Sequence, residues 1–223
     1  MTTELPRSWI WATPAQLASS ERHALAIGPF GSNLKVSDYR SSGVPLVFVR
    51  NIRTSVFDGP QSQFVSEEKA RALAAHRVEP GDILVTKMGD PPGDACIYPV
   101  GRPPAIITAD CIKFRVNENA GNVKYFAYAF GSPAVRSQVV GRTKGVAQQK
   151  ISLETFRTLR LPVAPVAEQD LIVAEIEKHF TRLDAGVEAL RRLQADLRRY
   201  RAAVLFEACG GRLAAEPLPA GWT

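Results

Sequence analysis

Apolar and polar residues follow one another in two different ways along the chain, and the change falls near residue 168. Before that point, short β-branched runs alternate with Gly, Pro, Asn and Asp, which is typical of strands bounded by turns. The predicted strands are Val44–Val49, Asp82–Thr86, Ala105–Thr108 and Cys111–Val116, and the predicted helices are Glu67–His76 and Val123–Phe130. Because strands and helices do not alternate regularly, we predict an α+β domain with a mixed, mostly antiparallel sheet.

The C-terminal part carries one helical period. Its apolar residues recur every three or four positions, at Ile172, Ile176, Phe180, Leu183, Val187, Leu190, Leu193, Leu197, Tyr200 and Val204. Pro165 precedes this run and Gly210 follows it, as helix start and stop signals do. We therefore predict a domain at residues 1–165 and one long helix at residues 166–209.

The length of this helix predicts a helical partner. About forty residues at the α-helical rise give a rod of about 60 Å, which is longer than a small domain is wide. Several large apolar side chains would then stand in water unless a second helix covered them. We therefore predict a coiled coil through the stripe. A core helix lying across its own domain is the alternative.

Composition and charge limit the classes of protein that fit. The chain has 223 residues with 28 Lys and Arg against 22 Asp and Glu, a net charge of +6. The helix segment 169–208 is balanced, so the excess lies in the first part of the chain. Between residues 136 and 160 a single acid, Glu154, accompanies Arg136, Arg142, Lys144, Lys150, Arg157 and Arg160. Such a cluster can neutralise phosphates, and a solvated basic face is the alternative.

We expect neither a metal site nor a membrane anchor in this sequence. Cys96, Cys111 and Cys209 are scattered and form no CxxC pair, so we expect no zinc. Unpaired thiols suit a reducing compartment. We find no basic and apolar leader at the N-terminus and no apolar run long enough to span a bilayer, and we expect a cytoplasmic protein.

Two segments resemble catalytic motifs without completing them. Gly28–Lys35 lacks the spacing of a phosphate-binding loop. Asp90-Pro91-Pro92 resembles the start of the [DN]PP-aromatic tetrapeptide of amino-methyltransferases, but Gly93 stands at the aromatic position. A turn is the preferred interpretation. A fragment of an adenine-specific DNA methyltransferase stays open as an alternative.

Several stretches, taken in order, resemble the specificity subunit of type I restriction–modification systems. The motifs are LPRSWIW at 5–11, FGSNLK at 30–35, DY at 38–39, GVP at 43–45, NI at 51–52, GDILVTKMG at 81–89, QQKI at 148–151, LPV at 161–163 and PVAEQ at 165–169, followed by IV at 172–173. Each motif alone is weak, but their order and spacing are fairly specific and cover nearly the whole chain. The sequence departs from the family at Ala164, where two prolines are usual.

The resemblance implies a non-catalytic DNA-reading subunit. Family members carry two inverted target recognition domains spaced by two long helices, and each domain recognises half of a bipartite site in double-stranded DNA. Modification subunits bind S-adenosylmethionine and methylate adenine, and restriction subunits use ATP. We therefore expect no cofactor on this chain, with S-adenosylmethionine, ATP and Mg²⁺ held by the partner subunits.

The end of the chain repeats its beginning. LPAGWT at 218–223 has the pattern of LPRSWI at 5–10, so we expect residues 210–223 to be a linker into a second recognition domain that this chain lacks. A natural half-sized subunit is the alternative. Without a second half, the stripe should pair with its own copy in a homodimer.

We choose candidate DNA contacts by side-chain chemistry and by their expected positions in loops, since the resemblance is strongest outside the family's variable reading loops. Gln and Asn can pair with adenine through two hydrogen bonds, and Arg pairs with guanine in the same way. Our candidates are the polar and basic residues Lys35, Arg50, Asn51, Arg53, Lys87, Arg142, Lys144, Gln148 and Gln149. A coiled-coil adaptor without base recognition stays open as a second alternative.

Overall fold

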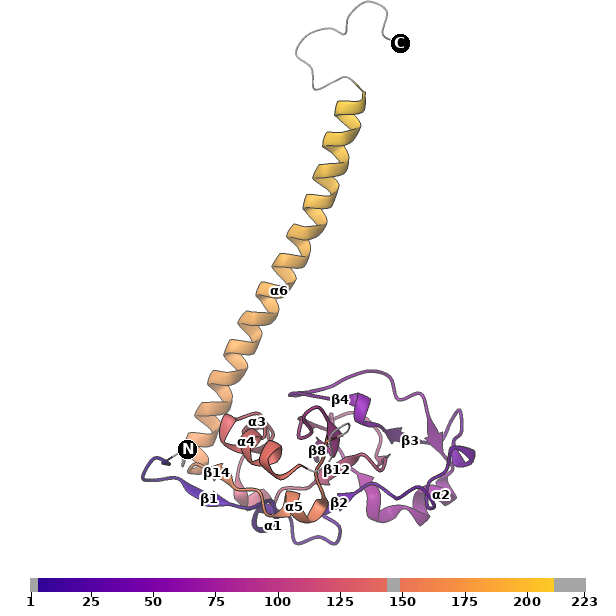
Figure 1. The fold of residues 1–223 in the computed structure, drawn as a ribbon, viewed down its shortest axis with the longest axis vertical. Coiled ribbons are helices and arrows are strands. Elements are labelled where there is room, and N and C mark those ends of the chain that lie inside the picture. Colours follow the sequence, from indigo (N-terminus) through magenta and orange to yellow (C-terminus); the bar gives the residue numbers. More distant parts are fainter. Residues whose placement is uncertain (1–3, 144–148, 211–223) are drawn as a thin grey trace, which may run out of the picture. The chain divides into compact units, whose positions relative to one another are not determined.

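The computed structural model describes residues 4–143 and 149–210. The chain divides into a compact unit that ends at Val173 and a second unit that begins at Ala174. The helices are α1 (Pro14–Leu17), α2 (Glu67–Ala72), α3 (Val123–Ala129), α4 (Pro133–Arg142), α5 (Leu153–Arg157) and α6 (Val166–Cys209), which runs without a break (Figure 1). Short 3-10 helices are η1 (Val36–Asp38), η2 (Val49–Asn51), η3 (Ala74–His76) and η4 (Glu118–Ala120).

The described strands are short and lie in the compact unit. They are β1 (Ile10–Ala12), β2 (Leu25–Ile27), β3 (Val44–Val47), β4 (Ile52–Arg53), β5 (Val56–Phe57), β6 (Phe64–Val65), β7 (Arg77–Val78), β8 (Ile83–Thr86), β9 (Met88–Gly89), β10 (Ala95–Ile97), β11 (Ala105–Ile107), β12 (Cys111–Phe114), β13 (Gln149–Lys150) and β14 (Leu161–Val163).

Two four-stranded sheets form the centre of the compact unit. The first has the order β10-β8-β12-β2 and is antiparallel throughout. The second has the order β6-β3-β11-β7, in which β3 and β11 run parallel with Ile106 opposite Leu46. The other pairs of this sheet are antiparallel. The predicted α+β fold with a mixed, mostly antiparallel sheet is confirmed.

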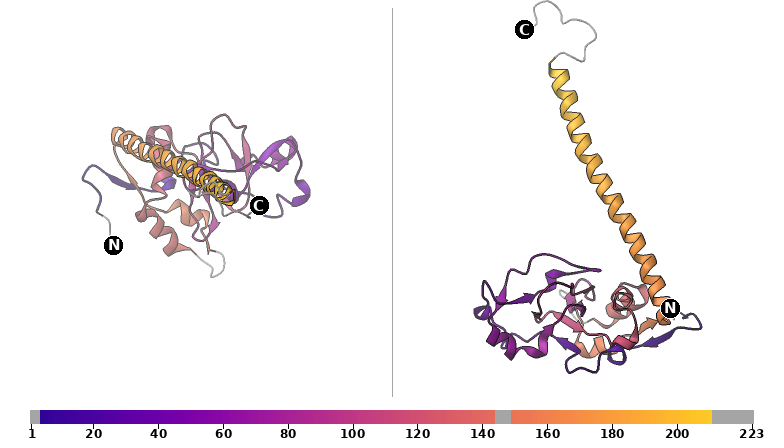
Figure 2. Two further views of the ribbon diagram at one scale, coloured as in Figure 1. Left: turned by 90° about the horizontal axis from the view of Figure 1, so that it is seen from above. Right: turned by 180° about the vertical axis from the view of Figure 1, so that it is seen from behind.

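Both sheets are buried on both faces, which explains their continuous apolar runs. In β8, Ile83 and Val85 contact a core beneath α3, α4 and α5, whereas Leu84 points into a second core between the two sheets. In β11, Ile107 faces that second core and Ile106 faces a third one beneath α2. The order of layers is therefore helices, sheet, sheet, helix. Strands β1 and β14 lie at one end of the unit and α2 lies at the other (Figures 1 and 2).

Several predicted elements end earlier than expected; the strand predicted at Cys111–Val116, for example, ends at Phe114. The strand predicted at Val44–Val49 stops at Val47, because the Asn51 side chain accepts the backbone N–H of Phe48 at 3.0 Å and closes the chain into η2. The helix predicted at Glu67–His76 is α-helical only to Ala72 and continues as the 3-10 turn η3. The long helix predicted from the apolar period is confirmed, at Val166–Cys209.

The first turns of α6 belong to the compact unit. Strand β1 pairs with β14, which directly precedes the helix, so the N-terminal segment lies beside the helix start. Trp9 Nε1 donates a hydrogen bond to Glu168 Oε1 at 3.0 Å. Val173 is also buried. These contacts join the start of the described chain to the beginning of α6.

Gln169 is the most enclosed polar residue of this junction, with no exposed surface. Its Nε2 donates to the carbonyl oxygens of Ala164 at 2.9 Å and Ala120 at 3.2 Å. Its Oε1 accepts the backbone N–H of Asn122 at 2.9 Å. Gly121 has φ +115° there, and a Cβ at this position would collide with the Gln169 amide. The amide therefore satisfies three backbone groups at this junction.

Replacement of this amide should destabilise the compact unit. We expect Gln169→Leu to lower the free energy of unfolding by about 3 kcal/mol, because buried donors and acceptors lose their partner. Urea unfolding followed by tryptophan fluorescence measures the change. Gln194→Leu makes the same substitution at an exposed position of α6 and should not lower that free energy. Equal stability of Gln169→Leu and the wild-type chain would contradict the structural role of Gln169.

Two of the three cysteines are inaccessible. Burial raises the pKa of the Cys96 and Cys111 thiols to about 12, whereas Cys209 is exposed. Raised pKa values keep both buried thiols protonated at pH 8, and the thiolate is the reactive form. We expect one fast-reacting thiol per folded chain in a thiol titration and three after denaturation. Loss of the fast phase in Cys209→Ser would identify Cys209 as the fast-reacting thiol. Any fast-reacting thiol that remains in this variant would contradict the burial of Cys96 and Cys111.

Candidate nucleic-acid interface

The pairing of β9 with β13 brings the basic segment of the sequence next to the end of β8. Gln149 lies opposite Gly89 and Lys150 lies opposite Met88. The backbone N–H of Ile151 donates to the carbonyl oxygen of Lys87 at 3.0 Å. Segments about sixty residues apart in sequence therefore lie side by side, with Lys87 in one and Gln149 in the other.

Arg142 ends α4, just before this pairing, and is exposed. Its guanidinium donates to the Thr158 carbonyl oxygen at 3.2 Å and to the Thr158 hydroxyl at 3.3 Å. The next residue, Thr143, contacts Gln149 through its hydroxyl at 3.5 Å. Candidates Lys144 and Gln148 lie outside the described residues. Arg142, Lys87 and Gln149 are thus the described candidates that the fold brings to one region.

The segment between β9 and β10 is held by side chains from three directions. The buried Thr86 hydroxyl accepts the backbone N–H groups of Gly93 at 2.9 Å and Asp94 at 3.0 Å. Arg136 from α4 forms an ion pair with Asp94 at 3.1 Å and donates to the Pro92 carbonyl oxygen at 3.3 Å. These bonds restrict the conformations of the loop that follows Lys87.

The third support comes from the hairpin of β4 and β5. The Thr54 hydroxyl donates to Asp94 Oδ1 at 3.2 Å, and the Ser55 backbone N–H donates to the Ala95 carbonyl oxygen at 2.8 Å. At Gly93, φ is +98° and a Cβ would press on Val139, so glycine suits the position best. Asp94 is therefore shared by the hairpin and by α4.

Lys87 is half-buried, and its ammonium group lies 5.3 Å from the centroid of the Phe30 ring. It also donates to the carbonyl oxygen of Ala109 at 3.3 Å. Phe30 is 64% exposed, so the cation and the ring share an accessible surface. A cation over an aromatic face is attracted to it, which orients the lysine side chain.

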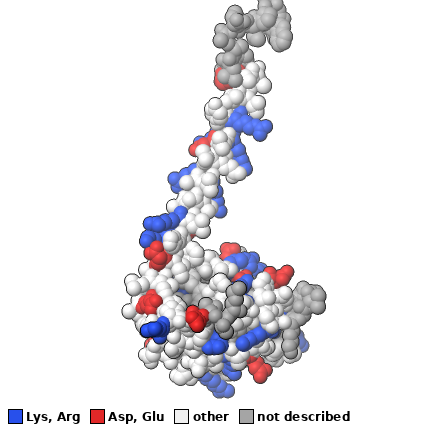
Figure 3. Space-filling model, turned by 60° about the vertical axis from the view of Figure 1, so that its left-hand side comes forward, with Lys and Arg blue, Asp and Glu red and all other residues white. Residues whose placement is uncertain are grey.

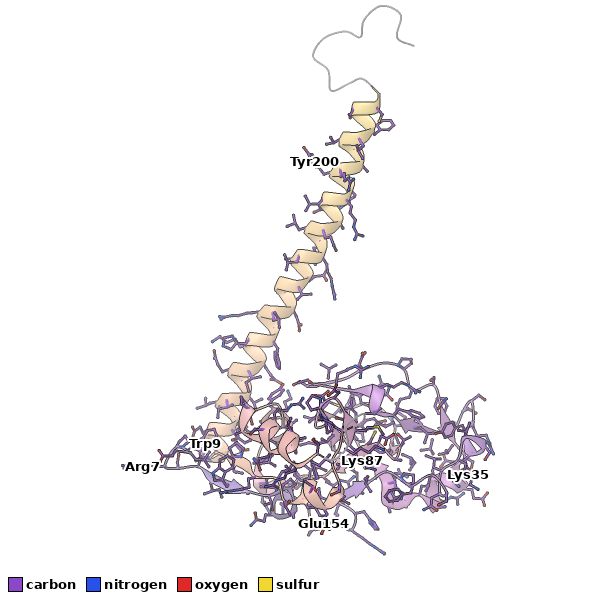
Figure 4. All side chains as sticks on the ribbon, in the orientation of Figure 1. Arg7, Trp9, Lys35, Lys87, Glu154 and Tyr200 are labelled. Carbon is purple, nitrogen blue, oxygen red and sulfur yellow. The ribbon has the colours of Figure 1, made fainter. Side chains whose placement is uncertain are left out.

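The other candidates occupy different places. Arg50 is exposed and its guanidinium lies 4.1 Å from the centroid of the Phe48 ring. Arg53, in β4, is exposed on the hairpin that contacts Asp94. Lys35 lies beside α2, to which the neighbouring Asp38 is tied by its ion pair with Lys69 at 3.1 Å. Figure 4 shows Lys35 well separated from Lys87.

Asn51 has a structural environment. It is 2% exposed, and its amide nitrogen donates to the carbonyl oxygen of Asp58 at 3.0 Å while its oxygen accepts the Phe48 N–H. Both ends of the amide are used inside the protein. We therefore leave Asn51 out of the surface proposed below.

Two arginines of the basic run between residues 136 and 160 already have partners within the compact unit. Arg136 is paired with Asp94, and the guanidinium of Arg160 lies 5.1 Å from the ring centroid of Trp11. On the face drawn in Figure 3, Lys and Arg are distributed over several places with Asp and Glu between them. Arg136 and Asp94 have supporting roles that sequence patterns did not reveal, because the pair spans 42 residues.

Other kinds of site are not formed by the described part of the chain. Within residues 4–143 and 149–210, no group of three His, Cys, Asp or Glu side chains is arranged to hold a metal ion. The helices within these ranges also include none with the length and apolar character needed to cross a membrane.

Comparison with known proteins identifies relatives. No family model matches the sequence. The chain is 29% identical over 188 residues to the type I restriction enzyme EcoBI specificity subunit of Escherichia coli, covering 83% of this chain and 37% of that protein. It is 22% identical to the StySPI specificity subunit of Salmonella potsdam, covering 94% of this chain and 44% of that protein. The chain thus spans less than half the length of these relatives.

Solved structures share the fold. The HsdS subunit from Thermoanaerobacter tengcongensis superposes with a TM-score of 0.60 at 18% identity, covering 95% of this chain and 47% of that one. A chain from a structure of the type I R-M system, solved to explain its complex assembly and conformational transition, superposes with a TM-score of 0.69 at 16% identity, covering 93% of this chain and 47% of that chain. The resemblance inferred from the motifs is confirmed: the chain is similar to the type I restriction enzyme specificity subunits.

Proposed function

We propose that the chain is the DNA sequence-recognition part of a type I restriction–modification complex and reads one half of a bipartite target. The similarity to specificity subunits over most of the chain carries this proposal. In it, residues 1–165 are the target recognition domain and residues 166–209 are the spacer helix. The chain docks methyltransferase subunits and, through them, restriction subunits. It is not itself catalytic, and S-adenosylmethionine, ATP and Mg²⁺ are bound by those partners.

The region around β9 and β13 supplies the chemistry for contacts to DNA. Lys87 and Arg142 carry the positive charge that phosphates attract. The Gln149 amide has both donors and an acceptor for a base edge. The loop held by Thr86, Arg136 and Thr54 keeps these groups in a defined geometry. A pre-ordered surface loses less entropy on binding than a loose one.

The basic residues of this surface should set the salt dependence of DNA binding. We expect the isolated chain to bind duplex DNA weakly, with Kd of about 10⁻⁴–10⁻⁶ M at physiological salt. Lys87→Gln and Arg142→Gln should each weaken binding and flatten the plot of log K against log salt by about 0.9. Fluorescence anisotropy over a salt series measures both effects. Arg182→Gln, an exposed change on α6, is the matched control and should leave the slope unchanged.

An unaltered slope in both surface variants would place the DNA interface elsewhere on the chain.

The methyltransferase alternative makes a different prediction, because such a fragment would bind S-adenosylmethionine. Calorimetry showing measurable affinity of the isolated chain would contradict our proposal. The adaptor alternative predicts that a reconstituted methyltransferase complex enriches no half-site motif from random DNA.

The apolar stripe of α6 is the proposed site of self-association. Leu183, Leu190 and Leu197 are 62%, 66% and 59% exposed. A two-fold pair of copies closes because one patch serves both chains. An axis perpendicular to the helices makes them antiparallel, which inverts the two recognition domains. Such a homodimer would select a palindromic bipartite site.

Charges on the stripe should separate the two copies. Leu190→Glu with Leu197→Glu should convert a micromolar dimer into a monomer of about 24 kDa, because charged groups cannot be buried in the seam without a large cost. Sedimentation equilibrium measures the mass. Ala195→Glu with Ala202→Glu adds the same charge beside the stripe and should leave the dimer intact. A wild-type chain that stays monomeric at high concentration would rule out the pairing.

A further inference from the structure

The charges along one edge of the stripe change sign at its middle. In a coiled coil, positions a and d of each seven-residue repeat form the apolar seam. If Val187 is at position a and Leu190 is at position d, then position e, directly after d, is occupied in successive repeats by Glu177, Asp184, Arg191 and Arg198. Residues in this place flank the seam of a coiled coil. The first two are acidic and the last two are basic, so the edge is divided into a negative half and a positive half.

The helix leaves most of these charges available. Its own ion pairs join Lys178 to Glu175 at 2.9 Å and Arg192 to Glu188 at 3.3 Å, and Arg199 also pairs with Asp196. Within the described part of α6, Asp184, Arg191 and Arg198 form no ion pair, and all three are exposed. Their charges can therefore act on a neighbouring helix.

In an antiparallel pair, corresponding edge positions of the two helices face one another. If the two-fold axis passes midway between Val187 and Leu190, Val187 packs against Leu190 of the second copy. Asp184 then faces Arg191 of the second copy, and Glu177 faces Arg198 of the second copy. Symmetry doubles both contacts, so four opposite-charge contacts flank the seam and no like charges meet along this edge.

Other arrangements are less favourable. If the register shifts by one heptad in one direction, Asp184 faces Asp184 of the second copy. If it shifts by one heptad in the other direction, Arg191 faces Arg191 of the second copy. A parallel, in-register pair puts Arg201, which occupies a seam position, against its own copy. Like charges placed opposite one another oppose pairing.

We propose that the divided edge of α6 selects a second copy of the same chain, in antiparallel orientation and with the axis between Val187 and Leu190. This inference rests on the antiparallel self-association proposed above and adds the register and the residues that select it. Apolar contacts supply the affinity, and the edge charges exclude the wrong alignments, as is common where specificity needs a repulsive element.

Charge reversal tests this register directly. Asp184→Arg and Arg191→Asp should each weaken self-association on the order of tenfold, because each converts two attractive contacts into repulsive ones. When the two variants are mixed, every edge contact is attractive again, so they should form a heterodimer in preference to either homodimer. The double variant should recover wild-type self-association. Sedimentation equilibrium, with one variant labelled, measures the association of each single variant, of their mixture and of the double variant.

Arg182→Asp is the matched control, since this exposed arginine lies away from the edge. It should leave the dimer constant unchanged. Cys209 reports orientation independently, because antiparallel helices hold the two Cys209 thiols about 60 Å apart at the α-helical rise. Oxidation should therefore give no disulfide-linked dimer, and efficient linkage would show a parallel pair and overturn the proposal.

The results distinguish failure of the self-association from failure of the register. A wild-type chain that remains monomeric removes the self-association and this inference together. A wild-type dimer whose constant is unaffected by both reversals keeps the self-association and overturns the register. Preferential heterodimer formation by the two reversed variants supports the register, because a parallel pair does not bring positions 184 and 191 together.

Discussion

The buried amide of Gln169 is the contact on which the junction between the compact unit and the first turns of α6 depends. Its three hydrogen bonds satisfy backbone groups of the segments before α3 and before α6. Buried backbone groups without partners cost about 1–3 kcal/mol each, so the helix start and the domain wall hold each other in place. The neighbouring Glu168 adds the side chain of Trp9 to the same junction. Two of the resembling motifs, far apart in sequence, therefore meet in one structural unit.

One helix consequently serves two environments. Val173 is buried in the compact unit, while Leu183 and Leu190, on the apolar stripe farther along the helix, are exposed. The three-to-four-residue spacing of apolar side chains continues past the point where burial ends, because this spacing follows the helix geometry alone. The continuation is a surface rather than a core, and an exposed stripe of this kind is typical of an interaction site.

The sequence predicted features that depend on many residues and missed those that depend on single contacts. The long helix has a clear period, and β8 carries apolar side chains toward both of its faces. By contrast, two-residue strands such as β9 and β13 carry no period. Burial of Asn51 was not predicted either, since the turn that it closes is set by two hydrogen bonds. The candidates near Lys87 gathered only because β9 pairs with β13.

In the proposed homodimer, affinity and orientation come from different residues of α6. Leu190 and Leu197 would give similar apolar contact in many alignments, because dispersion and burial are non-directional. Gln194 and Arg201 occupy seam positions, and polar groups there reduce stability while restricting the alignments that can form. A modest stripe with a divided charged edge therefore suits the proposed homodimer, in which the two copies would hold their compact units in one defined relation. A uniformly apolar seam would bind more tightly, but it would leave that relation unspecified.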